Sequence, residues 1–228
     1  MRYGVALDPD HPNRGAFAGR VAGRLGMTEH SVEAAAQQTR LILASRSPRR
    51  RELLSEAGYR VEVIPPGDEA EGDVSAGEEP AQLVARLAYQ KAADVARRVA
   101  AGVIVACDTV AECGGRVLGK PANETDARRM LHALRGREHR VLSGLCLWKV
   151  PGGEPRVRVA ITTLRLDPLA DAEIDGYLAS GTWRGKAGAF GYQDRLDWVH
   201  ILEGSPSNVV GLPLELLREM LLETHSGP

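Results

Sequence analysis

The fold of this 228-residue chain is decided by a stretch that reads Leu41-Ile42-Leu43-Ala44-Ser45-Arg46-Ser47-Pro48-Arg49-Arg50-Arg51-Glu52-Leu53-Leu54. Its apolar start, Leu41–Ala44, is typical of a short buried strand. Ser47 is favoured at a helix N-cap, and Pro48 suits the first helical position. Gly58 is placed to end the helix in a left-handed conformation. The stretch therefore predicts a strand, a serine-rich turn and a helix over 49–57.

Three consecutive arginines occupy the first turn of this helix, at positions 49 to 51. The helix dipole is positive at that end, so each arginine is unfavourable there by about 0.3–1 kcal/mol on its own. Free backbone N–H groups at a helix start bind anions, and arginine grips phosphate with paired hydrogen bonds. We therefore expect Ser45, Arg49 and Arg50 to bind a phosphate-rich ligand. The alternative is a solvated basic patch.

Helices and strands alternate along the rest of the chain. A strand is expected at Arg60–Ile64, a long helix from Pro80 to about Ala101, and a buried strand at Val103–Cys107. Gly114-Gly115 suits a hairpin turn. Further helices are expected over 123–134, 171–178 and 213–222, and long strands over 140–150 and 156–166. Because two long strands joined as a hairpin break a purely parallel plan, we expect an α/β fold with a mixed sheet flanked by helices.

The charge balance excludes several classes of protein. Lys and Arg number 29 against 30 Asp and Glu, which gives a net charge of -1. Such balance argues against a basic nucleic-acid coat and against an acidic disordered tail.

No apolar run approaches the roughly 18 residues of a membrane span, and the N-terminus lacks the apolar segment of a secretory signal. We expect a cytoplasmic enzyme with no nucleic-acid or membrane partner.

Cysteines and histidines indicate neither a disulfide framework nor a zinc site. The three cysteines, Cys107, Cys113 and Cys146, are odd in number and form no CxxC pair. The six histidines show no zinc-ligand spacing. We expect the cysteines to be reduced and buried.

Residues 1–40 differ in character from the rest of the chain. They are rich in glycine and show little periodicity, apart from one possible short helix over 29–40. We interpret 1–40 as an N-terminal extension that is weakly ordered or adds one helix, and 41–228 as the folded domain. Met27 is a candidate for the true start of the chain.

Two carboxylates are candidates for phosphate chemistry. Asp108-Thr109 directly follows the predicted buried strand, and an aspartate at the carboxyl end of such a strand faces the ligand crevice in open α/β sheets. It would then be a metal ligand or a general base, or else merely end the strand in a turn. Glu69 lies in an acidic loop between Pro65 and Glu79, where it is a second metal ligand or a solvated charge.

A lysine lies in a pattern that resembles a phosphate-binding loop. The segment Gly114–Lys120 matches G-x-x-x-x-G-K, but Pro121 stands where such a loop needs Ser or Thr to hold Mg²⁺. We therefore exclude a P-loop NTPase. Lys120 remains a candidate for contacting phosphate, or is a surface lysine.

The segment Gly185–Gln193 is dense in glycine, which permits close approach to a ligand. Gln193 carries a donor and an acceptor on one amide, and such a group matches the O4/N3–H edge of uracil or thymine. The alternative is a tight loop with an incidental glutamine. Ser207 and Asn208 line a pocket or cap a turn.

Taken in order, these segments resemble the Maf family of nucleoside triphosphate pyrophosphatases. The resemblance runs from Leu41 to about Leu222. It is carried by the opening stretch and by Asp68-Glu69, Arg86-Leu87-Ala88, Lys91-Ala92, Asp108-Thr109-Val110, Leu118-Gly119-Lys120-Pro121, Lys186-Ala187-Gly188-Ala189, Gln193 and Asn208-Val209-Val210-Gly211-Leu212-Pro213.

The resemblance implies a two-lobed, elongated Maf/ITPase-like molecule with a central cleft, which cleaves the α–β phosphoanhydride. It implies a divalent metal cation (Mg²⁺, Mn²⁺ or Co²⁺), a nucleoside triphosphate substrate and a homodimer. Asp108 matches the proton acceptor and, with Glu69, would hold the metal. Other matching positions are assigned to substrate choice (Arg49, Thr109 and Gln193) or to polar residues of the cleft (Arg50, Lys91 and Lys120).

The glycine-rich segment and the Asn208–Pro213 motif resemble the dTTP/UTP branch of the family. Phe190, Tyr192 and Asp194 depart from it, since that branch more often has Tyr, Ile and Gly there. Two alternatives remain open: a pyrophosphatase for 7-methyl-GTP or another modified nucleotide, and a non-catalytic nucleotide- or partner-binding regulator of division.

Overall fold

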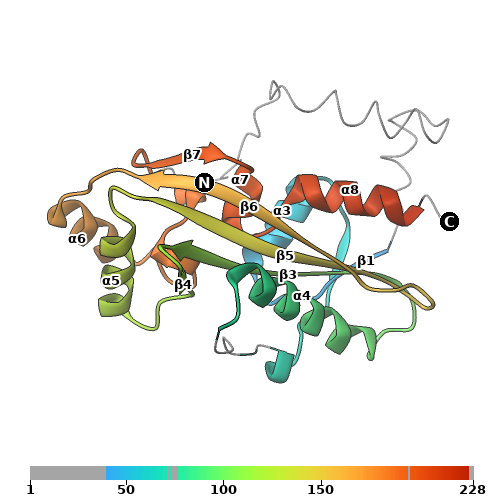
Figure 1. Cartoon of the computed structure of the whole chain (residues 1–228). Helices are drawn as coiled ribbons and strands as arrows, with labels where there is room; N and C mark the ends of the chain where they lie inside the picture. The colour runs from blue at the N-terminus through green and yellow to red at the C-terminus, as the bar shows by residue number, and fades with distance from the viewer. Residues whose placement is uncertain (1–39, 71, 73–76, 195, 226–228) are drawn as a thin grey trace.

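The computed structural model describes residues 40–70, 72, 77–194 and 196–225 (Figure 1). The expected helix over 29–40 and the candidate start at Met27 lie outside the described residues, apart from Arg40 itself.

A seven-stranded mixed sheet forms the centre of the molecule. The strands are β1 (Leu41–Leu43), β2 (Val61–Val63), β3 (Gly102–Cys113), β4 (Arg116–Leu118), β5 (Glu138–Val150), β6 (Arg156–Leu166) and β7 (Val199–Glu203). Their order is β2-β1-β3-β5-β6-β7, with β4 beside β3. The first three strands are parallel and the remaining pairs are antiparallel. The expected mixed sheet is thus confirmed.

Helices cover both faces of the sheet. They are α3 (Pro48–Glu56), α4 (Pro80–Ala96), α5 (Glu124–Leu134), α6 (Asp171–Ala179), α7 (Pro206–Val210) and α8 (Leu214–His225), with short 3₁₀ helices η1 (Asp68–Ala70), η2 (Ala187–Ala189) and η3 (Tyr192–Asp194). Successive side chains of a strand point to opposite faces of the sheet, so alternate residues of β1 and β3 contact the helices on opposite faces. Leu41 and Val103 pack in the same core cluster as residues of α3 and α8, whereas Ile42 and Ile104 pack with residues of α4.

The opening stretch folds as predicted. β1 is fully buried, and Ser47 lies at the N-cap of α3 with Pro48 as the first helical residue. Ser47 makes no side-chain cap bond; instead its backbone N–H donates to Ser45 Oγ at 3.1 Å. Gly58 follows α3 with a φ of 83°, the left-handed conformation expected after the helix.

Two predicted boundaries are wrong, and one strand was not predicted. β3 does not end at Cys107 but continues to Cys113, because its backbone stays paired with β5 as far as Glu112. A polar side chain interrupts an apolar run without interrupting the hydrogen bonds of the strand. α4 ends at Ala96, five residues before the predicted end, and Gly102 starts β3 with a φ of 138°. The short strand β7 was not predicted, since it lacks a clear apolar pattern.

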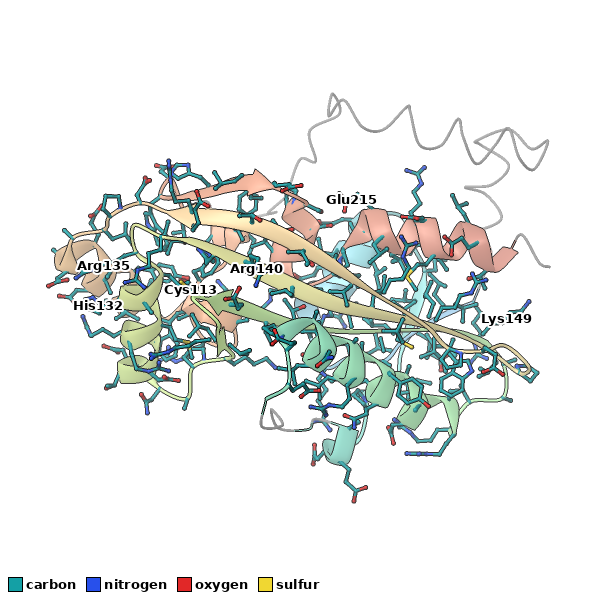
Figure 2. The ribbon with its side chains drawn as sticks, in the orientation of Figure 1. Cys113, His132, Arg135, Arg140, Lys149 and Glu215 are labelled. Atoms are coloured by element: carbon teal, nitrogen blue, oxygen red, sulfur yellow. The ribbon has the colours of Figure 1, made fainter. Side chains whose placement is uncertain are left out.

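The sheet carries two lobes, each with its own core, and the molecule is elongated (Figure 1). One core joins Leu131 of α5, Ile174 of α6 and Val199 of β7. The other joins Leu54 of α3 and Leu217 of α8 to β1 and β3. We call them the small lobe and the large lobe. Figure 2 shows His132 and Arg135 of α5 at one end of the molecule and Lys149 near the other. The predicted two-lobed α/β architecture is confirmed.

A glycine allows α4 to pack closely on the sheet. A Cβ on Gly144 of β5 would lie 2.1 Å from the carbonyl oxygen of Val84, far inside contact distance. Gly144 is also the register partner of Asp108 on β3. The close approach therefore occurs beside Asp108.

The three cysteines are free and buried, as predicted. Over the described ranges, no helix is long and apolar enough to cross a membrane.

Candidate active site

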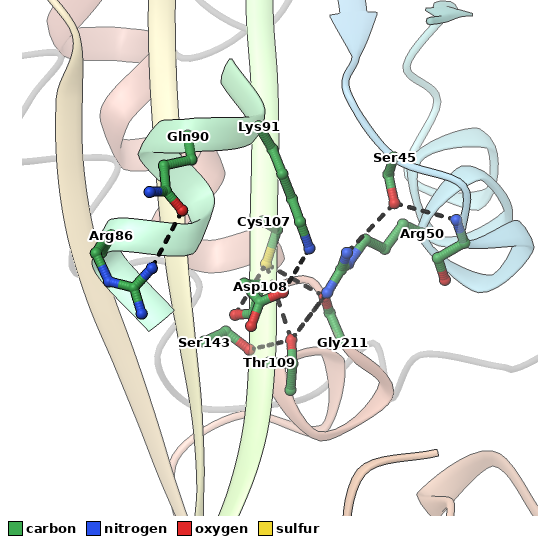
Figure 3. A network of polar contacts seen from close by, with 11 residues as sticks. Ser45, Arg50, Arg86, Gln90, Lys91, Cys107, Asp108, Thr109, Ser143 and Gly211 are labelled. Carbon is green, nitrogen blue, oxygen red and sulfur yellow. Dashed lines mark hydrogen bonds and ion pairs between the residues drawn. The ribbon is translucent and has the colours of Figure 1, made fainter. Parts of the chain in front are cut away.

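An aspartate–lysine pair lies at the middle of the sheet (Figure 3). Asp108 belongs to β3, and Lys91 reaches it from α4 with a distance of 2.5 Å between Nζ and Oδ1. Their side chains are 14% and 4% exposed. Asp108 was expected at the carboxyl end of a strand, and that placement is wrong: it lies inside β3, between residues that belong to the cores of the two lobes.

Arg50 connects three elements of the site (Figure 3). Its Nη1 donates to Ser45 Oγ after β1 at 3.3 Å, and its Nη2 donates to Thr109 Oγ1 of β3 at 3.1 Å. Its Nε donates to the carbonyl oxygen of Gly211, just after α7, at 2.8 Å. Thr109 also bonds Ser143 Oγ of β5 at 2.8 Å. Three of the five guanidinium donors are thus used to hold the group in place, which leaves it pre-organised.

Arg49 reaches from the large lobe to the small lobe. Its Nη2 donates to the carbonyl oxygen of Gly185 at 2.7 Å. Burial lowers the pKa of Arg49, and the neighbouring charge of Arg50 lowers it further. Two guanidinium groups therefore stand close together with their repulsion only partly relieved. An anion at this point would be bound favourably, as the first turn of α3 predicts.

The small lobe presents a second polar cluster next to Arg49. Lys186 forms an ion pair with Asp194, and Tyr177 donates to Asp194 Oδ2 at 2.8 Å. Burial lowers the pKa of Lys186, while its hydrogen bond to Asp194 opposes this shift. Burial raises the pKa of Tyr177, and the bond to Asp194 raises it further. Gln193 lies beside this cluster, and its Oε1 is buried with no hydrogen-bond partner in the described part of the chain.

The structure brings most of the predicted residues together, but not all of them. Ser45, Arg50, Lys91, Asp108 and Thr109 form one neighbourhood. Arg49 and Gln193 belong to the second cluster. Glu69 is exposed on η1, and Lys120 is exposed after β4. Within the described ranges, the contacts drawn around Asp108 include neither of them.

Sequence reasoning missed several polar residues of this region. Ser143 was not singled out, and its role follows from the register that places it opposite Thr109. Lys186 and Asp194 were not expected to pair. The available signal was a pair of opposite charges that bracket a segment rich in glycine, eight positions apart.

The side chains around Asp108 can hold a divalent cation only if a bound substrate supplies further coordinating oxygens. In the residues that the structure describes, no group of three or more His, Cys, Asp or Glu side chains is close enough to hold a metal ion. Mg²⁺ commonly uses one or two protein carboxylates and completes its shell with phosphate oxygens and water. Asp108, partly exposed and adjacent to Arg50 and Thr109, fits that role.

Comparison with known proteins places the chain in a family. The model of the Maf-like proteins matches residues 40–224. The chain is 50% identical over 182 residues to the dTTP/UTP pyrophosphatase of Rhodopirellula baltica, which covers 79% of this chain and 80% of that protein. It is 47% identical over 182 residues to the dTTP/UTP pyrophosphatase of Sphingopyxis alaskensis, covering 79% of this chain and 94% of that protein. The chain belongs to the Maf-like family.

Similarity to solved structures is lower. A HAM1 protein from Coxiella burnetii superposes with a TM-score of 0.46 at 16% identity, covering 82% of this chain and 100% of that chain.

Proposed function

We propose that the protein is a nucleoside triphosphate pyrophosphatase that hydrolyses the α–β phosphoanhydride of dTTP and UTP. Its products would be a nucleoside monophosphate and pyrophosphate. The observation that carries this proposal is the Lys91–Asp108 pair, set beside an Arg50 guanidinium whose position is determined by three elements. The relatives named dTTP/UTP pyrophosphatase support it.

Phosphate binding is assigned to the start of α3. Arg49 and Arg50, with the free N–H groups of the first turn, receive the negative charge of the triphosphate. Ser45 holds both the turn and Arg50 through its Oγ. The cations are in place before substrate arrives, so little reorganisation is needed when charge develops on the leaving group.

We assign to Asp108 the role of accepting the proton of the attacking water. Lys91 donates to Oδ1, which keeps the carboxylate oriented and leaves Oδ2 for water. Thr109 follows Asp108 on β3 and is hydrogen-bonded to Ser143. Because it accepts a hydrogen bond from Arg50, it orients the guanidinium group. Lys120 is assigned to the leaving pyrophosphate, since it follows β4 at the end of a hairpin segment rich in glycine.

A divalent cation (Mg²⁺, Mn²⁺ or Co²⁺) belongs to this proposal, held by Asp108 and Glu69 together with phosphate oxygens. When bound, such an ion would lower the pKa of water and neutralise phosphate charge. Glu69 is the weaker assignment of the two on geometry, because its side chain is exposed and η1 packs against α4.

Base recognition is assigned to Gln193. Its buried Oε1 has no partner in the described residues, and a buried acceptor without a partner costs about 1–3 kcal/mol. The N3–H of uracil or thymine is a donor that would satisfy it. Cytosine has an acceptor nitrogen at the matching ring position and would leave Oε1 without a proton.

The test is a panel of canonical and modified triphosphates with each of the three metals, with products separated by chromatography. We expect monophosphate and pyrophosphate from dTTP and UTP in preference to CTP. Preferential cleavage of 7-methyl-GTP would support the alternative specificity. Nucleotide binding without any pyrophosphate release would contradict the enzymatic proposal and support a non-catalytic regulator.

Three further expectations remain proposals: a cytoplasmic location, a homodimer, and a functional domain that starts after residue 40. Light scattering of the purified protein tests the dimer, and cell fractionation tests the location. Deletion of residues 1–39 tests the domain boundary, with unchanged turnover as the expected result.

A further inference from the structure

The small lobe contains a buried ion pair that phosphate chemistry does not require. Lys186 directly precedes η2, and Asp194 ends η3, so the pair closes the loop 186–194 at both ends. The Lys186 and Asp194 side chains are only 9% and 13% exposed. Removing two charges from water costs several kcal/mol per ion before their attraction is counted. Stability alone is therefore a poor explanation for the pair.

Three hydrogen bonds hold this pair in one geometry. The Lys186 ammonium contacts both carboxylate oxygens of Asp194. Tyr177 of α6 donates to Asp194 Oδ2 at 2.8 Å, and its ring packs edge-on against Trp198 at 5.4 Å. An ammonium has three N–H donors, so two of them are used by Asp194 and one remains.

Gly191 brings the Lys186 ammonium next to the amide of Gln193. A Cβ at position 191 would lie 2.8 Å from Lys186 Nζ and 2.9 Å from both amide atoms of Gln193. Without a side chain at that point, the three polar atoms converge on one face of the loop. Gln193 Oε1 has no partner in the described residues, so this face offers an unsatisfied acceptor beside an anchored cation.

We propose that Lys186 is a further specificity-determining residue, whose remaining N–H binds a carbonyl oxygen of a uracil or thymine base next to Gln193. Asp194 and Tyr177 are positioning residues that act through Lys186. This inference rests on the proposed function, because it takes a pyrimidine nucleotide as the ligand.

The set of donors and acceptors supports this assignment. Uracil and thymine present acceptor, donor and acceptor along O2, N3–H and O4. Lys186 Nζ and Gln193 Nε2 are donors and Gln193 Oε1 is an acceptor, which is the complementary set. Cytosine presents two adjacent acceptors and a donor, so its N3 would face Gln193 Oε1 with no proton between them. Because Asp194 neutralises Lys186, the ammonium suits a neutral carbonyl better than a phosphate.

The experiment compares Lys186→Met with Lys149→Met, a matched change at an exposed lysine near the far end of the sheet. The substrates are UTP, 2-thio-UTP, 4-thio-UTP and CTP. For UTP we expect kcat/KM to fall about 10- to 100-fold in Lys186→Met and to stay unchanged in Lys149→Met. Cytosine has an amino group in place of O4, so if Lys186 contacts O4 we expect little change for CTP in either variant, and the UTP/CTP ratio collapses only in the first.

The thio-substrates show which carbonyl is contacted. In the wild-type enzyme, sulfur at either carbonyl should lower kcat/KM, and in Lys186→Met this penalty should vanish only at the carbonyl that Lys186 contacts. Asp194→Asn and Tyr177→Phe should lower the UTP/CTP ratio in the same direction. Combining Asp194→Asn with Lys186→Met should add no further loss of the ratio.

Two results would overturn the inference. One is an equal loss of kcat/KM for every substrate in Lys186→Met, which indicates a purely structural pair. The other is an unchanged rate with both thio-substrates in the wild-type enzyme, a measurement that needs no variant to fold. A wild-type enzyme that cleaves no triphosphate contradicts the proposed function itself, whereas one that prefers UTP with an unaltered ratio in Lys186→Met contradicts only the role of Lys186.

Discussion

The two polar clusters of this molecule are positioned by different kinds of structure. Around Asp108 and Thr109, the backbone pairing of β3 with β5 determines where each side chain lies. Around Lys186 and Gln193, short 3₁₀ helices and a buried ion pair do so, and Ala189 adopts a φ of 63° that a non-glycine residue rarely takes. The first cluster is therefore as rigid as the sheet, whereas the second depends on side chains that a single substitution can release.

This difference suits two tasks. The chemistry assigned to the first cluster is the same for every nucleotide, so a position set by main-chain hydrogen bonds serves it well. Recognition of a base, assigned to the second, differs between substrates, and a loop can change without changing the sheet. Arg49 joins the two, from α3 to the carbonyl of Gly185.

The largest effect is expected from Asp108→Asn in the first cluster. The amide keeps the shape but cannot accept the proton of water, so kcat should fall by about 10³-fold, within the range of general base catalysis. Substrate should still bind, as measured by calorimetry with a non-hydrolysable analogue. Turnover close to that of the wild type would contradict the role of Asp108.

Gly144→Ala tests how far the sheet determines the first cluster. The new methyl would overlap the carbonyl oxygen of Val84, so α4 must move away from β5. We expect a loss of about 3 kcal/mol in the free energy of unfolding, as for other overpacked sites. Denaturant unfolding measures it, and Gly176→Ala on α6, where the space is open, is the matched control. An equal, small loss in both variants would show that α4 adapts freely.

The pH dependence of stability tests the core of the small lobe. Burial lowers the pKa of His139 from 6.5 to about 4, with the nearby carboxylate of Glu112 opposing the shift. As the pH falls, the unfolded state therefore binds this proton at a higher pH than the folded state does. The free energy of unfolding is unaffected by His139 above pH 6.5 and decreases as the pH falls from there toward 4. We expect about 2–3 kcal/mol of this loss by pH 4.5, since each tenfold change in proton affinity is worth about 1.4 kcal/mol.

His139→Leu should remove that pH-dependent loss, because leucine does not titrate and Nε2 of His139 has no partner in the described residues. The comparison of the two unfolding curves at pH 7.5 and 4.5 measures the difference. Equal slopes in wild type and variant would exclude His139 as the cause.

The smallest effect is expected from Gly191→Ala in the second cluster. Its methyl would separate Lys186 from the amide of Gln193, so the UTP/CTP ratio of kcat/KM should fall about tenfold. Cleavage of CTP should be unchanged, because the cluster around Asp108 is not touched. A fall in kcat/KM for both UTP and CTP would show that a change at Gly191 also disturbs the cluster around Asp108.

Much of the fold could be predicted from local patterns. The strand, serine turn, proline start and glycine end of the stretch at 41–58 are signals between neighbours in sequence, and the structure follows them. The length of β3 could not be predicted, because it depends on a partner strand some thirty residues away. For the same reason the sequence placed Asp108 at a strand end, although it identified the residue.

The candidate site shows the same division. The unfavourable placement of arginines in the first turn of a helix can be recognised in the sequence, because the helix dipole acts only over that turn. The Lys91–Asp108 contact requires α4 to cross β3 and β5 closely, which depends on Gly144. Nothing near Lys186 in sequence shows that Tyr177 also bonds its partner Asp194.

By itself, then, the sequence determined most of the helices and strands, the serine turn before α3 and the identity of the charged residues, because propensity, capping and charge act over a few residues. Tertiary structure alone decided which of these charges meet. Burial makes a charge expensive unless a partner is close, and only the packed sheet and its loops bring Lys91 to Asp108 and Lys186 to Asp194.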